Sequence, residues 1–158
     1  MTKIRAAHIE DAPSILNLIK DLAVFEKEPN AVEITENDLV KDGFGDTPKF
    51  KCFVAEESGR IIGMALVYTR FSTWKGEVLH LEDLIVEQNH RGQGVGTQLL
   101  DAVVAHAKAI QVKRVSWEVL DWNSKAIDFY KSKGANVMPY WDVVHLDENG
   151  IKNYLKAL

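Results

Sequence analysis

A glycine-rich stretch, "HRGQGVGTQLL" at residues 90–100, has the composition of a phosphate-binding turn. Three glycines at alternate positions follow Arg91 and precede an apolar run with helical spacing. A tight turn at a helix start presents backbone N–H groups and the positive end of the helix dipole, and both attract anions. The turn therefore predicts either a phosphate cradle or a plain tight connection into a helix.

The spacing of these glycines excludes two common nucleotide loops. A P-loop requires a Gly-Lys pair, which this chain does not contain. The dinucleotide-binding fingerprint would place its third glycine at residue 97, where the chain has Thr97. A bound phosphate would therefore have to belong to a different kind of ligand.

Two adjacent carboxylates, Glu82 and Asp83, lie in the otherwise apolar run "LHLEDLIV". A charge in such surroundings is costly unless it is paired or functional. Adjacent residues of a strand point to opposite faces, so we expect one carboxylate in a substrate cleft and the other buried or structural. A carboxylate facing a cleft can bind a cationic amine and accept its proton, directly or through water, whereas the alternative for both is an ordinary strand residue.

Other reactive side chains are sparse. The five histidines show no H-x-x-x-H pair, so we expect no metal site. Cys52 is the only cysteine, which favours a reducing compartment, and its alternation with Phe50 and Val54 predicts a buried strand position. The net charge of -4 makes nucleic acid an unlikely partner. No apolar run has the length of a membrane span, and the N-terminus lacks the apolar core of a signal peptide, so we expect a cytoplasmic protein.

The elements that position these residues follow a mixed order of strands and helices. Period-two patterns predict strands over 3–7, 50–57, 60–71, 77–86, 112–120 and 136–146. Helical patterns and cap residues predict helices over 10–25, 35–43, 95–110, 123–133 and 149–158, with Thr35 as the N-cap of the second helix and Gly43 just past its end. Because three successive strands form a meander before the first crossover helix, we expect an α/β (α+β) fold with a mixed, mostly antiparallel sheet flanked by helices. No linker or repeat interrupts the chain, so residues 1–158 are expected to form a single domain.

Two separated motifs resemble those of the GNAT acetyltransferase superfamily. Arg91, Gly94 and Gly96 occupy the fixed positions of its acetyl-CoA signature, [RQ]-x-x-G-x-[GA], between a strand and a helix. The stretch "VLDWNSKAIDFYKSKGA" is similar to its later helix motif, with Asn123, Tyr130 and Gly134 at the corresponding positions. The segments "DGFGDTP", "STWKGEVLHLED" and "VLDWN" resemble the diamine acetyltransferase branch, which includes spermidine/spermine and thialysine N-acetyltransferases.

This resemblance implies a site and a set of roles. Tyr130 would be the general acid for the departing CoA thiolate, Glu82 would relay the amine proton, and the backbone N–H near Leu84 would stabilise the oxyanion. The resemblance implies that acetyl-CoA is held by Leu84, Ile85, Val86, Arg91, Gly92, Gln93, Gly94, Val95, Gly96, Asn123 and Tyr130. It implies that the amine is held by Phe25, Glu26, Trp74, Glu82, Asp83 and Trp141. Asn123 could equally be a helix N-cap, Tyr130 a packed core residue, and both tryptophans core or dimer-interface residues.

The resemblance implies an acetyl-CoA-dependent N-acetyltransferase that acts by direct attack in a ternary complex and needs no metal. The expected acceptor is a small primary amine, either a thialysine or lysine-like amino acid or a diamine or polyamine. The chain has "VMPY" before Trp141, where members of the branch carry acidic residues, and this disfavours spermine. Two alternatives stay open, a protein or peptide N-acetyltransferase and a non-catalytic acetyl-CoA-binding domain. A homodimer is expected from the resemblance alone.

Overall fold

Alternating apolar residues form one five-stranded sheet in the order β1-β2-β3-β4-β5. The strands are β1 (Lys3–Ala6), β2 (Lys51–Glu57), β3 (Arg60–Ser72), β4 (Gly76–Val86) and β5 (Val115–Ser116). The first three pairings are antiparallel and the fourth, between β4 and β5, is parallel. The predicted mixed, mostly antiparallel sheet is confirmed.

The structure is a computed structural model that describes residues 1–156. Its contacts divide the chain into two compact units, residues 1–118 and 119–158, and each is described by itself. The first unit contains the whole sheet, the 3-10 turns η1 (Ile9–Asp11) and η2 (Gln88–His90), and the helices α1 (Ala12–Phe25), α2 (Glu36–Phe44) and α3 (Val95–Ala109).

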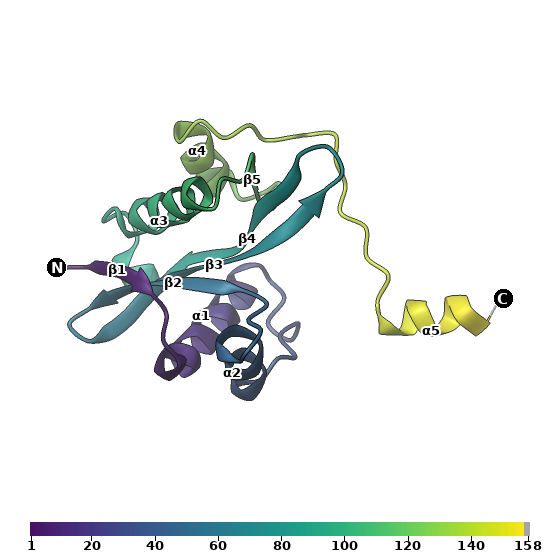
Figure 1. Cartoon of the computed structure of the whole chain (residues 1–158), viewed down its shortest axis with the longest axis horizontal. Helices are drawn as coiled ribbons and strands as arrows, with labels where there is room; N and C mark the ends of the chain where they lie inside the picture. Colours follow the sequence, from purple (N-terminus) through teal and green to yellow (C-terminus); the bar gives the residue numbers. More distant parts are fainter. Residues whose placement is uncertain (157–158) are drawn as a thin grey trace. The chain divides into compact units, whose positions relative to one another are not determined.

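Helices cover both faces of this sheet, with α1 and α2 on one face and α3 on the other (Figure 1). The core between the sheet and α1 contains Ile15, Leu18, Cys52 and Met64, each less than 5% exposed. On the opposite face, α3 buries the stripe Val95, Leu99, Leu100, Val103 and Ala107. The burial of Cys52 confirms its predicted position, and it raises the pKa of the thiol to about 12.

The helix α2 begins at the predicted cap and ends later than the sequence indicated. The Thr35 hydroxyl accepts a hydrogen bond from the Asp38 backbone, and the Asp38 carboxylate accepts one from the Thr35 backbone. Gly43 was expected just past the end but lies inside the helix. A side chain there would collide with the ring of Phe50, since a Cβ would lie 2.3 Å from its Cζ. Gly43 therefore allows α2 to lie close to Phe50 and does not end the helix.

The second unit contains α4 (Ser124–Ser132) and α5 (Glu148–Lys156). The helix predicted over 149–158 is present as α5, and its last two predicted residues lie outside the described part of the chain. The strand predicted over 136–146 is not formed: the residues are irregular, with a turn at Pro139 and Tyr140. Proline lacks the N–H of a strand ladder, and no described strand pairs with this segment.

The strand predicted over 112–120 is likewise reduced to the two residues of β5. Only Leu79 and His80 of β4 pair with it. A period-two pattern predicts extended backbone, but a ladder also needs a neighbour at the right distance, and β5 leaves β4 after these two pairs.

Candidate active site

A β-bulge in β4 determines where the two strand carboxylates point. Leu66 of β3 pairs with Asp83, and the next residue of β3, Val67, pairs with Leu81, so Glu82 is an extra residue. A bulge reverses the side-chain alternation at the point of insertion. Glu82 and Asp83 therefore lie on the same face of the sheet, and the expectation of opposite faces is wrong.

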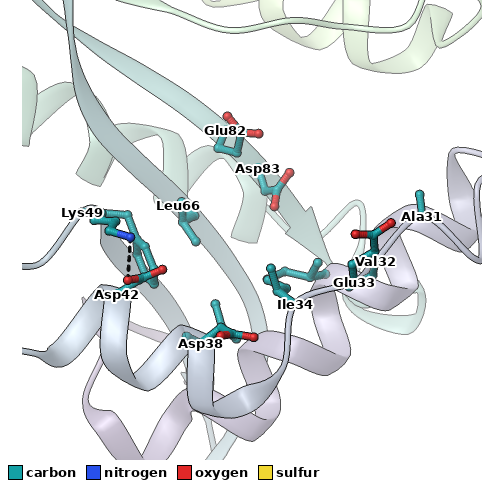
Figure 2. A pocket seen from close by; sticks show the side chains of 13 residues that line it. Ala31, Val32, Glu33, Ile34, Asp38, Asp42, Lys49, Leu66, Glu82 and Asp83 are labelled. Atoms are coloured by element: carbon teal, nitrogen blue, oxygen red, sulfur yellow. Dashed lines mark ion pairs between the residues drawn. The ribbon is translucent and has the colours of Figure 1, made fainter. Parts of the chain in front are cut away.

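Both carboxylates line one cavity of about 470 Å³ on the face of the sheet covered by α1 and α2. The cavity lies within the first unit, and its apolar floor includes Ile19, Leu39 and Leu66. Figure 2 shows Glu82 and Asp83 on one strand, with Asp38 and Asp42 on the helix across the hollow. The lining acids are Glu33, Asp38, Asp42, Glu82 and Asp83, and the lining cation is Lys49.

The partners of these acids differ. The Asp38 carboxylate accepts the hydrogen bond from the Thr35 backbone at the start of α2. Asp42 forms an ion pair with Lys49 at 2.8 Å (Figure 2). The carboxylates of Glu33 and Asp83 have no hydrogen-bond or ion-pair partner within residues 1–156. The cavity is therefore acidic and holds carboxylates that a bound cation could neutralise.

The two neighbouring carboxylates have opposite pKa shifts. Burial raises the pKa of Asp83 to about 6, and the charges of Glu82 and Glu26 add to the rise. The imidazole of His80 lowers the pKa of Glu82, partly against burial, and a hydrogen bond from Tyr68 adds to this effect. The environment of Glu82 therefore favours its ionised form. The ionised form of Asp83 is disfavoured, and a nearby cation would stabilise it.

The glycine-rich turn joins β4 to α3. Gly92 and Gly94 have φ of +75° and +85°, conformations that favour glycine, and a side chain on either would meet no atom within 4 Å. Gly94 is the N-cap of α3, and no side chain caps the first turn. The first backbone N–H groups of α3 are therefore not capped by the N-cap residue's side chain. Arg91 ties the turn down, because its Nε donates to the carbonyl of Val86 at 2.8 Å.

The residues expected to contact acetyl-CoA through the backbone form the end of β4. Leu84, Ile85 and Val86 pair with β3 on one side. On the other side β4 has no strand neighbour beyond His80 within the described sheet, because β5 pairs only with Leu79 and His80. This edge offers backbone groups to a ligand. The remaining predicted residues of the turn, Gln93, Val95 and Gly96, continue from it into the first turn of α3.

Three predicted amine-binding residues of the first unit lie outside the cavity lining. Glu26 is the C-cap of α1, and its charge reaches Asp83. Phe25 lies under the guanidinium of Arg91, with 5.2 Å between Cζ and the ring centroid. Trp74 lies in the turn between β3 and β4 and is 78% exposed. Their predicted contact with the amine stays a prediction.

The second unit contains the other predicted residues. Asn123 caps α4, where its side chain accepts a hydrogen bond from the Ala126 backbone at 3.3 Å. Tyr130 is buried, and its ring packs against Phe129. Trp141 is 69% exposed in the irregular segment. The N-cap interpretation of Asn123 is confirmed, and the catalytic and cofactor roles of these residues stay predictions.

Sequence reasoning missed His80 and Tyr68, which face Glu82, and Ser116, which contacts His80. The Nε2 atom of His80 lies 3.5 Å from Oε2 of Glu82, and its Nδ1 atom lies 3.5 Å from Oγ of Ser116. The i, i+2 spacing of His80 and Glu82 in a strand could have indicated the first contact. No pattern in the sequence indicated that residues 31–34 and α2 line the cavity.

Within residues 1–156, no group of three or more His, Cys, Asp or Glu side chains could hold a metal ion. No described helix has both the length and the apolar character needed to cross a membrane.

Comparisons with known proteins agree with this architecture. The Acetyltransferase (GNAT) family model matches residues 13–135. The chain is 40% identical to thialysine N-epsilon-acetyltransferase of Bos taurus, over 84% of this chain and 82% of that protein. It is also 40% identical to spermidine/spermine N(1)-acetyltransferase-like protein 1 of Homo sapiens, over 84% of this chain and 20% of that protein. An integron cassette protein from the mobile metagenome of V. cholerae has the same fold, with a TM-score of 0.80, 23% identity and 98% of each chain covered. The chain belongs to the GNAT acetyltransferase family, and its fold is the GNAT fold.

Proposed function

We propose that this acetyltransferase transfers the acetyl group of acetyl-CoA to a primary amine of a small cationic molecule, by direct attack in a ternary complex. The acidic cavity carries the proposal, because it places five carboxylates and a single lysine around a space suited to a small ligand. Two of the relatives bear the names of small-amine acetyltransferases, one for thialysine and one for spermidine and spermine.

The cavity supplies what an amine acceptor needs. An alkylamine with a pKa of about 10.4, taking lysine as the reference, is almost fully protonated at neutral pH and must lose a proton before it attacks. Asp83 and Glu33 would bind the ammonium groups, since neither carboxylate has a partner in the described structure. Glu82, ionised and 52% exposed at its side chain, would accept the proton directly or through water.

The donor would lie along the end of β4 and the turn after it. Acetyl-CoA is the co-substrate of the GNAT family. The open edge at Leu84, Ile85 and Val86 would bind its pantetheine arm, and the N–H near Leu84 would stabilise the oxyanion. The amides of residues 91–96 would hold the pyrophosphate, and the open space around Gly92 and Gly94 fits that role.

The second unit would supply the remaining chemistry. Tyr130 would protonate the departing thiolate, because a phenol with an ordinary pKa of about 10 is a proton donor at neutral pH. The family model spans residues 13–135 and so crosses the boundary between the two units. This coverage supports a single catalytic domain over 1–158.

Among small amines, the cavity favours a diamine over an amino acid. An amino acid acceptor carries a carboxylate that needs a cation, and the lining Lys49 is already paired with Asp42. The thialysine relatives support the opposite choice, so both classes belong in the test.

We also propose a cytoplasmic homodimer that binds neither nucleic acid nor membrane. The net charge of -4 supports the last two points, and the exposed side chains of Phe71 at the end of β3 and Trp74 in the following turn support self-association. Sedimentation equilibrium of the full chain and of Trp74→Ser tests the dimer: a monomeric wild-type protein contradicts it.

The decisive experiment measures free CoA released from acetyl-CoA with diamines, polyamines, lysine, thialysine and peptides as acceptors. We expect small amines to be acetylated and peptides not. Glu82→Gln should lower kcat by about 10²-fold or more, as for loss of a general base. Glu77→Gln, a carboxylate at the far end of the same strand, is the matched control and should retain activity. A protein that binds acetyl-CoA and acetylates no amine would refute the proposal.

A further inference from the structure

His80 is one of two buried polar or charged side chains in the described part of the chain, with 7% exposure. The other, Asp11, forms an ion pair with Arg5 at 2.6 Å. His80 instead contacts groups on three strands. Glu82 follows two residues later in β4, Tyr68 is its directly paired residue in β3, and Ser116 is its paired residue in β5.

These contacts determine which tautomer the imidazole adopts. The carboxylate of Glu82 only accepts hydrogen bonds, so Nε2 of His80, at 3.5 Å from Oε2, must carry the hydrogen. In the neutral ring Nδ1 is then the acceptor, and it faces the Ser116 hydroxyl, which can donate to it at 3.5 Å. The chain of donors runs from Ser116 through His80 to Glu82.

The ring is also held in position by packing. The rings of His80 and Tyr68 are tilted with their centroids 5.1 Å apart. The Tyr68 side chain also lies against the carboxylate that the imidazole faces and helps to lower its pKa. Glu82 thus has two donors on its own strand and on β3, while the adjacent Asp83 has none within residues 1–156.

The bulge makes this arrangement possible. Because Glu82 is the extra residue of β4, it stays on the face of His80 while Asp83 also turns to that face. The Glu82 side chain, which faces these donors, lines the cavity and is 52% exposed, whereas the side chain of His80 is 9% exposed.

We propose that His80 is a positioning residue for acetyl transfer: its Nε2–H orients the Glu82 carboxylate toward the acceptor ammonium, and Ser116 fixes the tautomer of the imidazole. This inference rests on the proposed function, in which Glu82 accepts the amine proton. The depressed pKa of Glu82, caused first by His80, agrees with it. The other titratable groups facing the pair are Tyr68 on β3 and Asp83 on β4, and the charges of Arg70 on β3 and Glu118 after β5 act on Tyr68.

The test uses substitutions that separate the two ring nitrogens. His80→Gln places an amide N–H near the position of Nε2 and can still donate to Glu82. His80→Asn places its amide near the position of Nδ1 and cannot reach Glu82. His80→Phe keeps the ring and loses both nitrogens. His106→Phe, on α3 against Phe53, is the control for loss of a histidine outside the site.

We expect His80→Phe and His80→Asn to lower kcat by about tenfold, with the KM for acetyl-CoA changed less than about twofold, since only proton acceptance is affected. His80→Gln should recover most of kcat, and His106→Phe should match the wild-type protein. The Glu82 carboxyl, followed by carbon-13 NMR during a pH titration, should titrate at higher pH in His80→Phe and close to the wild-type value in His80→Gln.

Two results would overturn the inference: an unchanged Glu82 titration in His80→Phe, or an equal loss of kcat in the Gln and Asn variants. The NMR titration needs no substrate, so it decides on the His80–Glu82 pair even if the wild-type chain acetylates no amine. A wild-type chain that acetylates no amine would refute only the proposed function. Thermal melting of each variant identifies any that fails to fold, and the remaining variants keep the comparison decisive.

Discussion

Asp83 should destabilise the folded protein at neutral pH, and its replacement by asparagine tests this directly. Burial and the charges of Glu82 and Glu26 raise the pKa of its carboxyl from 3.8 to about 6. The unfolded chain therefore gives up this proton more readily than the folded protein does. Between these two values the folded state binds more protons, so stability falls as the pH rises.

The size of the effect follows from the shift. Each pKa unit corresponds to about 1.36 kcal/mol, so a rise of about two units sets an upper limit of about 3 kcal/mol above pH 6. Solvent reaches the half-buried carboxylate, and this reduces the expected gain of Asp83→Asn to about 1–2 kcal/mol at pH 7. The melting temperature should rise by about 3–6 °C, given about 3 °C per kcal/mol for a chain of this size.

Urea denaturation of both proteins at several pH values between 3.5 and 7.5 measures the difference. The gain of the variant should shrink as the pH falls through 6 and vanish below 3.8, where the carboxyl is protonated in both states. Glu33→Gln, another carboxylate of the cavity wall but an exposed one, is the matched control and should change stability by less than about 0.5 kcal/mol. An Asp83→Asn protein that is equally or less stable at pH 7, or whose difference does not depend on pH, would refute the reasoning.

Three further substitutions test the donor side. Tyr130→Phe should lower kcat by about 10²-fold; full activity at every pH would exclude a general-acid role. Gly94→Ala should raise the KM for acetyl-CoA by about tenfold, because φ of +85° strains any side chain, whereas Gly76→Ala, with φ of +79° in the β3–β4 turn, should leave that KM unchanged. Asn123→Ala should cost about 1 kcal/mol of stability and Asn123→Ser much less, since serine also caps helices; a higher KM for acetyl-CoA in Asn123→Ser would separate CoA contact from capping.

The elements of the first unit were predictable because their signals are local. The capping box at Thr35, the glycines of the turn at 91–96 and the apolar stripe of α3 each depend on residues within a few positions of one another. The two strand predictions that were wrong or too long, over 136–146 and 112–120, depend on a partner strand. A period-two pattern is local, but the pairing that turns it into a ladder is not.

The candidate site was only half predictable for the same reason. Glu82 and Asp83 were identified by their cost in an apolar run, but their common face results from the register between β3 and β4. No single residue marks the bulge. The contact of Glu82 with His80 and the carboxylates of Glu33 and Asp38 around the cavity likewise follow from tertiary structure.

In the proposed function, the bulge would let two adjacent carboxylates take different parts in one reaction. In a regular strand they would face opposite sides and could not meet the same substrate. On one face, Glu82 receives the donors of His80 and Tyr68 and stays ionised, so it is available as a proton acceptor. Asp83 receives only desolvation and like charge, so the opposite charge of an arriving ammonium would offset them and lower the pKa of Asp83. In the proposed function, this uncompensated carboxylate would favour a cationic amine over a neutral acceptor of the same shape.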